Sequence, residues 1–590
     1  MVHYAITPLD PHGHQFAVTL QVTPRHAEAL TLTLPAWIPG SYMIRDFARN
    51  ILDLRAEANG QALTVKAIDK QSWQIAASAH PITINYLVYA FDLSVRSAYL
   101  DQFWGFFNNS SLCLAVQGYE HHCIDLTLQL PEQLADWHVA TGMPRLHGET
   151  FGAGRFRAEN YDALLDYPFL LGKLGIHEFI AGGRKHALVT AGRCAIDAER
   201  ICGDLATLCE YQIELFDKQA PFDQYLFLTM VVGQGFGGLE HRNSTALMCS
   251  RRDLPHAGVE LATSKDYQTF LSLCSHEYFH SWNIKTLKPK EFLPYQLDRE
   301  QYTRQLWFYE GVTSYFDDYV LHAAGLIDAD TYLARIGDTL ARVQRGVGGE
   351  RQTVADSSFH AWTRFYKQDE NAPNAIVSYY AKGALIALCL DLLIRSQTRA
   401  AQNLGTVMSA FWQRYGKTLE GTTETSFADF LQATYKVNLH AFISRAIDST
   451  EPLPVTELLH DFGVEVTRAA AQDDNSYGGR AAQQPLPVSL GARFKGNANG
   501  LELQVVFADE AAQLAGLSAQ DRIIAFDHLQ ITGDNFRELM QRYRHGDTVT
   551  VHAFRRDELF VTTLVWQAPK ASNFLLKVTD PTRAQGWLQL

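Results

Sequence analysis

The stretch His276-Glu277-Tyr278-Phe279-His280 decides how the rest of the chain is interpreted. Two histidines four residues apart face the same side of a helix, about one turn apart, so both imidazoles can bind one metal ion. Zinc is typical of this pattern, and the glutamate after the first histidine is then placed to act on a zinc-bound water. The stretch therefore predicts a zinc site on a helix.

The residues before this stretch predict the helix that carries it. Thr263-Ser264-Lys265-Asp266 is typical of a helix N-terminus. Apolar residues then follow with helical spacing and form one face: Tyr267, Phe270, Leu271, Cys274 and Tyr278. His276 and His280 lie off this face, which favours metal binding over a role as core histidines.

A catalytic zinc site needs three protein ligands and one open position. The best candidate for the third ligand is Glu310, a lone acid within Trp307-Phe308-Tyr309-Glu310-Gly311, on a helix expected over 303–324. A buried carboxylate there needs a partner, because an unpaired buried charge is costly. The alternatives are another histidine as the ligand, or a Glu310 that points to solvent or pairs with an arginine.

The same residues predict a hydrolytic mechanism. Zinc acidifies its bound water, and Glu277 would take the proton while the water attacks a carbonyl carbon. The oxyanion that forms needs a hydrogen-bond donor, and the hydroxyl of Tyr380, on a helix expected to begin near 378, is the candidate.

Length and charge limit the class of protein. The chain has 590 residues, too many for one hydrophobic core, so three or more domains are expected. A net charge of −13 argues against nucleic-acid binding and against a polybasic membrane surface. No signal-like pattern is visible, the longest apolar run is short and charged, and the eight cysteines form no C-x-x-C pair, so a cytoplasmic protein with reduced thiols is expected.

The hydrophobic pattern changes along the chain and predicts a multidomain α+β protein. The early segments alternate with period two, whereas later segments have helical spacing and the last ones alternate again. The expected parts are an N-terminal β-sandwich over 1–172, a catalytic domain over 173–455 (a β part over 173–255 and a helical part over 256–455), a connector over 456–484, a small binding module over 485–570 and a C-terminal tail over 571–590.

A glycine-rich turn follows a strong strand expected over 224–232. Gly233, Gly235 and Gly238 match the G-x-G-x-x-G spacing of a dinucleotide-binding fingerprint. That interpretation fails because the fingerprint needs a helix after the third glycine, whereas 243–249 is patterned as a strand and no βαβ unit is expected nearby. A turn between strands, with its backbone open to a ligand, fits better.

The metal motif and its partners resemble the gluzincin metallopeptidases. His276-Glu277-Tyr278-Phe279-His280 followed by Trp307-Phe308-Tyr309-Glu310-Gly311 is similar to the aminopeptidase N group, which has a thermolysin-like, mostly helical catalytic domain. In that group a glutamate from a later helix is the third zinc ligand, which implies His276, His280 and Glu310 here. Tyr380-Ala381-Lys382-Gly383 resembles the group's Tyr-Glu-Lys-Gly, whose tyrosine stabilises the transition state.

The glycine-rich turn carries a second resemblance. Gly237-Gly238-Leu239-Glu240-His241 resembles the exopeptidase motif Gly-x-Met-Glu-Asn of the same group. The resemblance implies that Glu240 binds the free α-amine of a substrate. It also implies that the substrate backbone pairs with the strand formed by Gly237, Gly238 and Leu239.

The closer resemblance is to the PDZ-containing glycyl aminopeptidase family of gluzincins. Segments 276–283, 39–42 and 105–108 are similar to that family's own stretches. From their residues alone, 35–42 and 105–111 suggest an aromatic core followed by a turn. The resemblance covers nearly the whole chain. It implies a zinc aminopeptidase, with one zinc ion per chain, that removes N-terminal glycine or alanine from peptides with a free N-terminus. Leu239 and His241 depart from aminopeptidase N, which weakens any transfer of its specificity.

The module over 485–570 resembles a PDZ domain. Its carboxylate-binding loop would be Leu490-Gly491-Ala492-Arg493-Phe494, and 511–524 resembles the family's helix and G-L-x-x-G-D-x-I stretch, with Gln520 in place of the glycine. A PDZ groove binds the C-terminus of an extended peptide as an added strand, so such a peptide is a candidate partner. Alternatively, the module only packs on the catalytic domain, or its groove accepts the chain's own end, Leu588-Gln589-Leu590.

Three functions stay open on the residues alone. The leading one is the zinc aminopeptidase. The second is a zinc endopeptidase whose PDZ domain presents protein C-termini, which would cleave an N-acetylated substrate as well as a free one. The third is a non-catalytic PDZ-containing peptide-binding protein, which Glu277 and Tyr380 argue against, because a structural zinc site would close its fourth position with another ligand. No oligomeric state is predicted.

Overall fold

The computed structural model describes residues 2–258 and 264–588. The chain forms two compact units, each described here by itself. Unit 1 is Met1–Gln301 with Trp412–Gly421, and unit 2 is Tyr302–Phe411 with Thr422–Leu590. The pentapeptide His276–His280 lies in unit 1, whereas Glu310, Tyr380 and the C-terminal module lie in unit 2.

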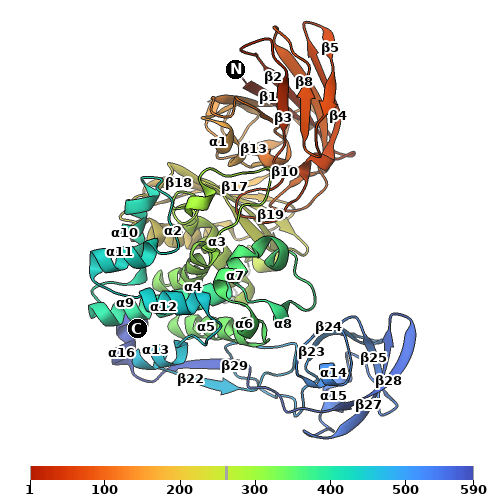
Figure 1. The fold of residues 1–590 in the computed structure, drawn as a ribbon, viewed down its shortest axis with the longest axis vertical. Coiled ribbons are helices and arrows are strands. Elements are labelled where there is room, and N and C mark those ends of the chain that lie inside the picture. Colours follow the sequence, from red (N-terminus) through yellow and green to blue (C-terminus); the bar gives the residue numbers. More distant parts are fainter. Residues whose placement is uncertain (1, 259–263, 589–590) are drawn as a thin grey trace. The chain divides into compact units, whose positions relative to one another are not determined.

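The N-terminal part of unit 1 is rich in β-strands, as predicted, and is built from three sheets around one apolar core (Figure 1, red to orange). Alternate residues of each strand face this core; β1, for example, buries Val2, Tyr4 and Ile6. The strands are β1 (Val2–Asp10), β2 (Gln15–Val22), β3 (Leu30–Thr33), β4 (Ile51–Ala58), β5 (Gln61–Leu63), β6 (Val65–Ala67), β7 (Ser72–Ile75), β8 (Ile82–Tyr89), β9 (Ala98–Leu100), β10 (Trp104–Phe107), β11 (Ala115–Val116), β12 (Ile124–Leu128), β13 (His138–Ala140), β14 (Arg145–His147), β15 (Gly154–Ala158) and β16 (Phe169–Gly172), with the short helix α1 (Tyr161–Leu165).

The sheet orders are β14-β15-β12-β1-β2-β8-β4-β5, β13-β16-β10-β9 and β11-β3-β7-β6. The loop after β10 confirms the expectation of an aromatic core followed by a turn. Phe106 and Phe107 are buried, and the Asn109 side chain donates to the carbonyls of Leu164 at 2.8 Å and Tyr167 at 2.9 Å. This segment therefore holds α1 against the sheet.

A five-stranded sheet with the order β17-β18-β19-β21-β20 carries the glycine-rich turn. Its elements are β17 (Gly175–Ala181), β18 (Arg184–Ala191), α2 (Ala198–Leu215), β19 (Gln224–Val232), β20 (Gly237–Glu240) and β21 (Ser244–Ser250). Because β18 and β19 are parallel and joined by α2, they form a βαβ unit, and the prediction that none lies nearby was wrong. The fingerprint is still absent, because Gly238 lies within β20, which pairs antiparallel with β21.

Helices dominate after this sheet, as predicted. The main ones are α3 (Lys265–Phe279), α4 (Val312–Ala323), α5 (Ala329–Gln344), α6 (Gly348–Arg351), α7 (Val354–Phe359), α8 (Ala372–Ala375), α9 (Ala381–Thr398), α10 (Leu404–Phe411), α11 (Ser426–Tyr435), α12 (His440–Asp448) and α13 (Val455–Asp461). The helix expected over 303–324 begins later, with a π-helical turn at Trp307–Gly311 that runs into α4. Within 2–258 and 264–588, no helix has the length and apolar character needed to span a bilayer.

The C-terminal module forms one sheet around its own core. Its elements are β23 (Ala492–Asn497), β24 (Gly500–Val506), α14 (Ala511–Leu514), β25 (Arg522–Phe526), β26 (Leu529–Gln530), α15 (Phe536–Met540), β27 (Thr548–Arg555) and β28 (Glu558–Val565). The sheet order is β23-β24-β25-β27-β28, with β26 paired to β25, so β23 lies at an edge. Helix α15 is short and packs Phe536, Leu539 and Met540 on this core.

The segments expected as connector and tail are joined to each other. Strand β22 (Val464–Ala469) pairs antiparallel with β29 (Asn573–Val578), and helix α16 (Pro581–Leu588) follows. Trp587 of this helix is buried against Tyr332, and the carbonyl of Leu588 accepts a hydrogen bond from His322 at 2.7 Å. The chain as far as Leu588 therefore packs on the helices of unit 2. The alternative in which Leu588-Gln589-Leu590 enters the module's groove stays a prediction, because residues 589–590 lie outside the described chain.

A buried cluster of charges ties α1 to the loop after β20. Three nitrogen donors surround the Asp166 carboxylate: Lys285 Nζ at 2.8 Å, Arg242 Nε at 3.0 Å and His241 Nδ1 at 3.1 Å. Burial alone would raise the pKa of Asp166, but the charge of Lys285 and the hydrogen bond from His241 outweigh it and hold the pKa well below its usual range. The cluster fixes His241 directly after Glu240.

Replacing Asp166 by asparagine should lower the free energy of unfolding at neutral pH by about 3–5 kcal/mol, because buried Lys285 loses its charged partner. The folded pKa of Asp166 lies below the unfolded value of about 4, so the stabilisation is present above that pH and is lost as the pH falls below it. Chemical denaturation at neutral and at acidic pH measures both the loss of unfolding free energy and its dependence on pH. Asp136→Asn is the control, since it breaks an exposed pair with Lys173 and should change little. An equal loss at both pH values would contradict this account.

Candidate active site

Helix α3 positions the pentapeptide. Ser264 caps it by accepting a hydrogen bond from the Tyr267 backbone N–H at 3.1 Å; Thr263 of the predicted cap lies outside the described residues. The predicted apolar face is confirmed, because all five of its residues are buried. The helix ends at Phe279, so His276 lies in its last turn and His280 at its C-cap.

The two histidines of the motif lie together. Their Nε2 atoms are 2.9 Å apart, and the two rings are perpendicular. His280 Nδ1 lies 2.8 Å from the carbonyl oxygen of Asn283. Because a carbonyl only accepts, Nδ1 carries the proton, and Nε2 carries a lone pair, which is the form of imidazole that binds a metal ion. Two imidazole nitrogens this close together are placed to bind the same metal ion.

Glu277 is buried and packs directly against β20. A Cβ atom added to Gly238 would lie 2.1 Å from Glu277 Oε1, so only glycine leaves room for this carboxylate. The carboxylate oxygens of Glu277 and Glu240 and a ring nitrogen of His280 all lie within 4.8 Å of one another. The structure therefore brings Glu240, predicted from a separate motif, to the pentapeptide.

Glu240 is a buried carboxylate with an unused acceptor. Its side chain belongs to a residue that is 4% exposed, and its Oε1 has no hydrogen-bond partner among the described residues. Two carboxylates as close as Glu240 and Glu277 repel each other, and burial makes that repulsion stronger. The arrangement is suited to a positively charged group between or beside them.

The N-terminal β-domain closes one side of Glu240, which the sequence analysis did not predict. Gly40 has a φ of +89°, and a Cβ atom there would lie 2.4 Å from both Glu240 carboxylate oxygens. The Arg96 guanidinium donates to the carbonyl of Gly238 at 3.3 Å. The only sequence signal for this contact was the resemblance of segment 39–42 to a family stretch, because the two residues lie far apart in the sequence, Gly40 in a turn after β3 and Glu240 at the end of β20.

The backbone proposed to bind substrate lies at a sheet edge. Strand β20 is the last strand in its sheet order and pairs on one side with β21, through Gly237–Glu240. Leu239 is buried, whereas Gly237 and Gly238 are half-buried. An edge strand of this kind presents backbone groups that its own sheet does not pair. Among them here, the carbonyl of Gly238 accepts from Arg96.

Unit 2 holds the other two predicted residues close to each other. Glu310 is buried in the π-helical turn, and Gly311 touches Gly383 of α9, where a Cβ on Gly311 would lie 2.5 Å from the Gly383 Cα. This close approach brings Glu310 beside Tyr380. Burial raises the pKa of the Tyr380 hydroxyl well above its usual value and the charge of Glu310 raises it further, so the hydroxyl stays protonated at neutral pH and can donate.

The loop predicted to bind a carboxylate lies elsewhere in unit 2. Leu490 and Gly491 precede β23, and Ala492, Arg493 and Phe494 form its first residues. The loop is therefore a separate site within the C-terminal module.

Comparisons with known proteins match both parts of the chain. Residues 3–173 match the family model for the Peptidase M61 N-terminal domain, and residues 269–386 match that for M61 glycyl aminopeptidase. A crystal structure of an aminopeptidase N family protein from Idiomarina loihiensis is 56% identical, covers 100% of both chains and has a TM-score of 0.98. No curated protein matches the chain.

More distant structures match part of the chain. An M1 zinc metallopeptidase from Deinococcus radiodurans is 13% identical over 77% of this chain and 94% of its own, with a TM-score of 0.48. A mutant of it bound to a peptide substrate is 15% identical over the same shares, with a TM-score of 0.47. These two scores are too low to carry an argument about this chain. The two family matches and the 56% identity across the whole chain show that this protein is a metallo-aminopeptidase of the M61 glycyl aminopeptidase family.

Proposed function

We propose that this protein is a zinc aminopeptidase that removes N-terminal glycine or alanine from peptides. The observation that carries the proposal is the buried pair Glu240 and Glu277, which lies beside two converging imidazoles and leaves Glu240 Oε1 without a partner among the described residues. A zinc ion and the ammonium group of a substrate would together supply positive charge that offsets the negative charge of these two carboxylates. The preference for glycine or alanine rests on the family resemblance.

His276, His280 and Glu310 are the proposed ligands of one zinc ion per chain. The tautomer of His280 supports this, since its Nε2 is unprotonated, and so does the convergence of the two Nε2 atoms. Glu310 supplies a buried carboxylate from unit 2. Two histidines and one glutamate leave a fourth position open for catalysis.

Glu277 is the proposed general base. A zinc ion bound by these ligands would polarise the substrate carbonyl and lower the pKa of water. Glu277 then accepts a proton from the attacking water and passes it to the leaving amine. The Tyr380 hydroxyl donates to the oxyanion that forms on the carbonyl, which its raised pKa allows.

Glu240 is the proposed binding residue for the α-amine of the substrate. Because a free α-amine is present only at the N-terminus, this contact would restrict cleavage to the first residue and make the enzyme an exopeptidase. Its Oε1, which has no partner among the described residues, can accept from an ammonium group, and the backbone at Gly40 lies close to both carboxylate oxygens. A peptide chain that extended past its first residue toward Gly40 would meet this backbone. The remaining residues of the substrate pair with the open edge of β20, at Gly237, Gly238 and Leu239.

For the C-terminal module we retain the interpretation as a PDZ domain. Its edge strand β23 and helix α15 support it, because Phe494 and Phe536 place their rings 4.6 Å apart between these elements. The edge strand and the helix would form the two walls of the groove.

Replacing Glu277 by glutamine should abolish hydrolysis of a glycyl or alanyl amide, with a loss of about 10²–10⁴-fold or more, because the amide cannot accept the proton from water. Zinc content, measured by metal analysis of the purified protein, should stay the same. Glu178→Gln, on an exposed position of β17, is the matched control and should keep full activity. Full activity in Glu277→Gln would end the assignment.

Replacing Glu240 by glutamine should lower kcat/KM for a glycyl amide by roughly 10–100-fold, because a charged hydrogen bond to the ammonium group is lost. The N-acetylated amide should be a poor substrate for the wild type and the variant alike. The comparison is made by measuring kcat/KM of the wild type and of the variant for the free and the N-acetylated amide. If the wild type cleaves the acetylated substrate equally well, the endopeptidase alternative is correct.

Replacing Gly40 by alanine should lower kcat/KM by about tenfold or more with zinc content unchanged, because the new Cβ displaces the Glu240 carboxylate. Gly60→Ala is the control: φ is +75° there, and a new Cβ meets no atom within 4 Å. Both variants carry backbone strain of about 1–2 kcal/mol, so the difference in kcat/KM isolates the effect on Glu240. Equal values for the two variants would refute the contact's role.

A further inference from the structure

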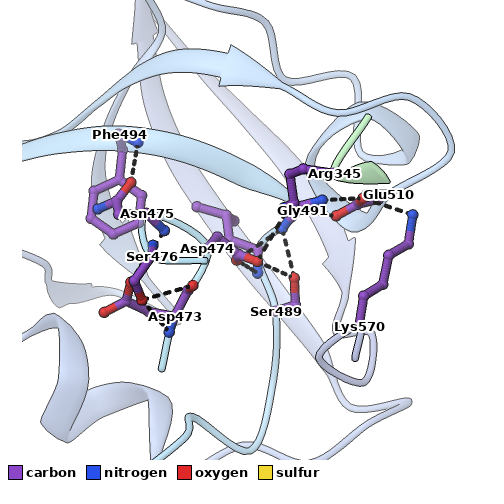
Figure 2. Close-up of polar contacts among 11 residues, drawn as sticks. Arg345, Asp473, Asp474, Asn475, Ser476, Ser489, Gly491, Phe494, Glu510 and Lys570 are labelled. Carbon is purple, nitrogen blue, oxygen red and sulfur yellow. Dashed lines mark hydrogen bonds and ion pairs between the residues drawn. The ribbon is translucent and has the colours of Figure 1, made fainter. Parts of the chain in front are cut away.

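The predicted carboxylate loop of the C-terminal module already holds a carboxylate. The backbone N–H groups of Leu490 and Gly491 donate to Asp474 Oδ2 at 2.7 Å and 3.1 Å, and the Ser489 hydroxyl donates to Oδ1 at 2.6 Å (Figure 2). Gly491 has a φ of +71°, which turns successive N–H groups toward one point. Asp474 lies in the segment that precedes the module, not in the module's sheet.

The residue after Asp474 occupies the start of the edge strand. Asn475 Oδ1 accepts a hydrogen bond from the backbone N–H of Phe494 at 2.9 Å, where the carbonyl of an added peptide strand would otherwise pair (Figure 2). On the other side, Arg537 of α15 donates to Asp473 Oδ2 at 3.0 Å. The segment 473–475 is thus held by both walls of the proposed groove.

A local turn aims Asp474 at the loop. The Asp473 carboxylate accepts from the backbone N–H groups of Asn475 and Ser476, both at 3.1 Å, and closes an Asx turn. Burial raises the pKa of Asp474, while the hydrogen bond from Ser489 and the charge of Arg345 oppose the rise. The hydrogen-bond donors around Asp474 replace the hydrogen bonds to water that a carboxylate loses when it is buried.

The same carboxylate takes part in docking the module on the helices of unit 2. The buried guanidinium of Arg345, which follows α5, donates to Glu510 at 2.8 Å and to Asp474 at 3.4 Å, and stacks 3.6 Å from the centroid of the Phe507 ring. Asn374 adds a second anchor, since it donates to the carbonyl of Val506 at 2.8 Å and accepts from the N–H of Ala508 at 2.9 Å.

We propose that Asp474 and Asn475 form an internal ligand of the C-terminal module. The Asp474 carboxylate occupies the loop in the way that a peptide C-terminus would, and Asn475 pairs with the edge of β23. The module is therefore closed to external C-terminal peptides in the folded protein, and its groove serves to lock it onto the helices of unit 2. The inference rests on unit 2 alone and is independent of the proposed peptidase activity.

The test is chemical rescue of Asp474→Ala in the full-length protein. Removing the carboxylate takes the acceptor from the Leu490 N–H and leaves the Gly491 N–H with the Ser489 hydroxyl alone, so Tm should fall by several degrees, and acetate should restore part of the loss. Sodium chloride at equal ionic strength should not restore it. Hydrogen exchange measured by mass spectrometry should show faster exchange in peptides covering 489–494, by roughly tenfold, with slowing on addition of acetate.

Controls separate the loop from a general salt effect. Asp534→Ala removes an exposed carboxylate from the same module and should show no response specific to acetate, and neither should the wild type. If Asp474→Ala fails to fold, Asp474→Asn keeps the shape without the charge and should show the same faster exchange over 489–494. Wild-type exchange as fast as that of the variant, or a variant indifferent to acetate, would overturn the proposal.

Discussion

The two buried carboxylates Glu240 and Glu277 set the constraint on which the active site depends. Their oxygens lie within 4.8 Å of each other and of His280, in surroundings where like charges repel strongly. The absence of a side chain at Gly238 leaves space for the Glu277 carboxylate, and its absence at Gly40 leaves space for the Glu240 carboxylate. The two acids therefore depend on two glycines that lie far apart in the sequence of unit 1. Such a pair is most stable with positive charge beside it, which the proposed metal ion and substrate amine would supply.

Much of this site could be predicted from local sequence. The helix of His276 and His280 follows from one capping residue and one apolar face, and both belong to a single stretch of chain. Local pattern could not reveal that Gly40 lies against Glu240, because the two residues lie far apart in the sequence. The local sequence pattern also failed to predict the βαβ unit, because α2 has helical spacing whether or not its flanking strands are parallel.

The pairing of β22 with β29 could not be predicted from local sequence either. Strands β22 and β29 are short, and each depends on a partner on the far side of the module, so neither is stable or recognisable alone. Their pairing makes the module an insertion between two strands of unit 2. An insertion fixed at both ends has less freedom than a domain on a single flexible linker, which agrees with the buried contacts made by Arg345 and Asn374.

Arg345 binds two carboxylates at once, Glu510 in the module and Asp474 in the segment that precedes it. Occupancy of the loop and attachment of the module are therefore thermodynamically linked through one guanidinium. Whatever weakens the hold of Arg345 on Glu510 must also change the affinity of the loop for Asp474, and the reverse holds by the same factor. Under the proposal that Asp474 fills the loop, replacing it by another carboxylate would therefore also change how firmly the module is attached.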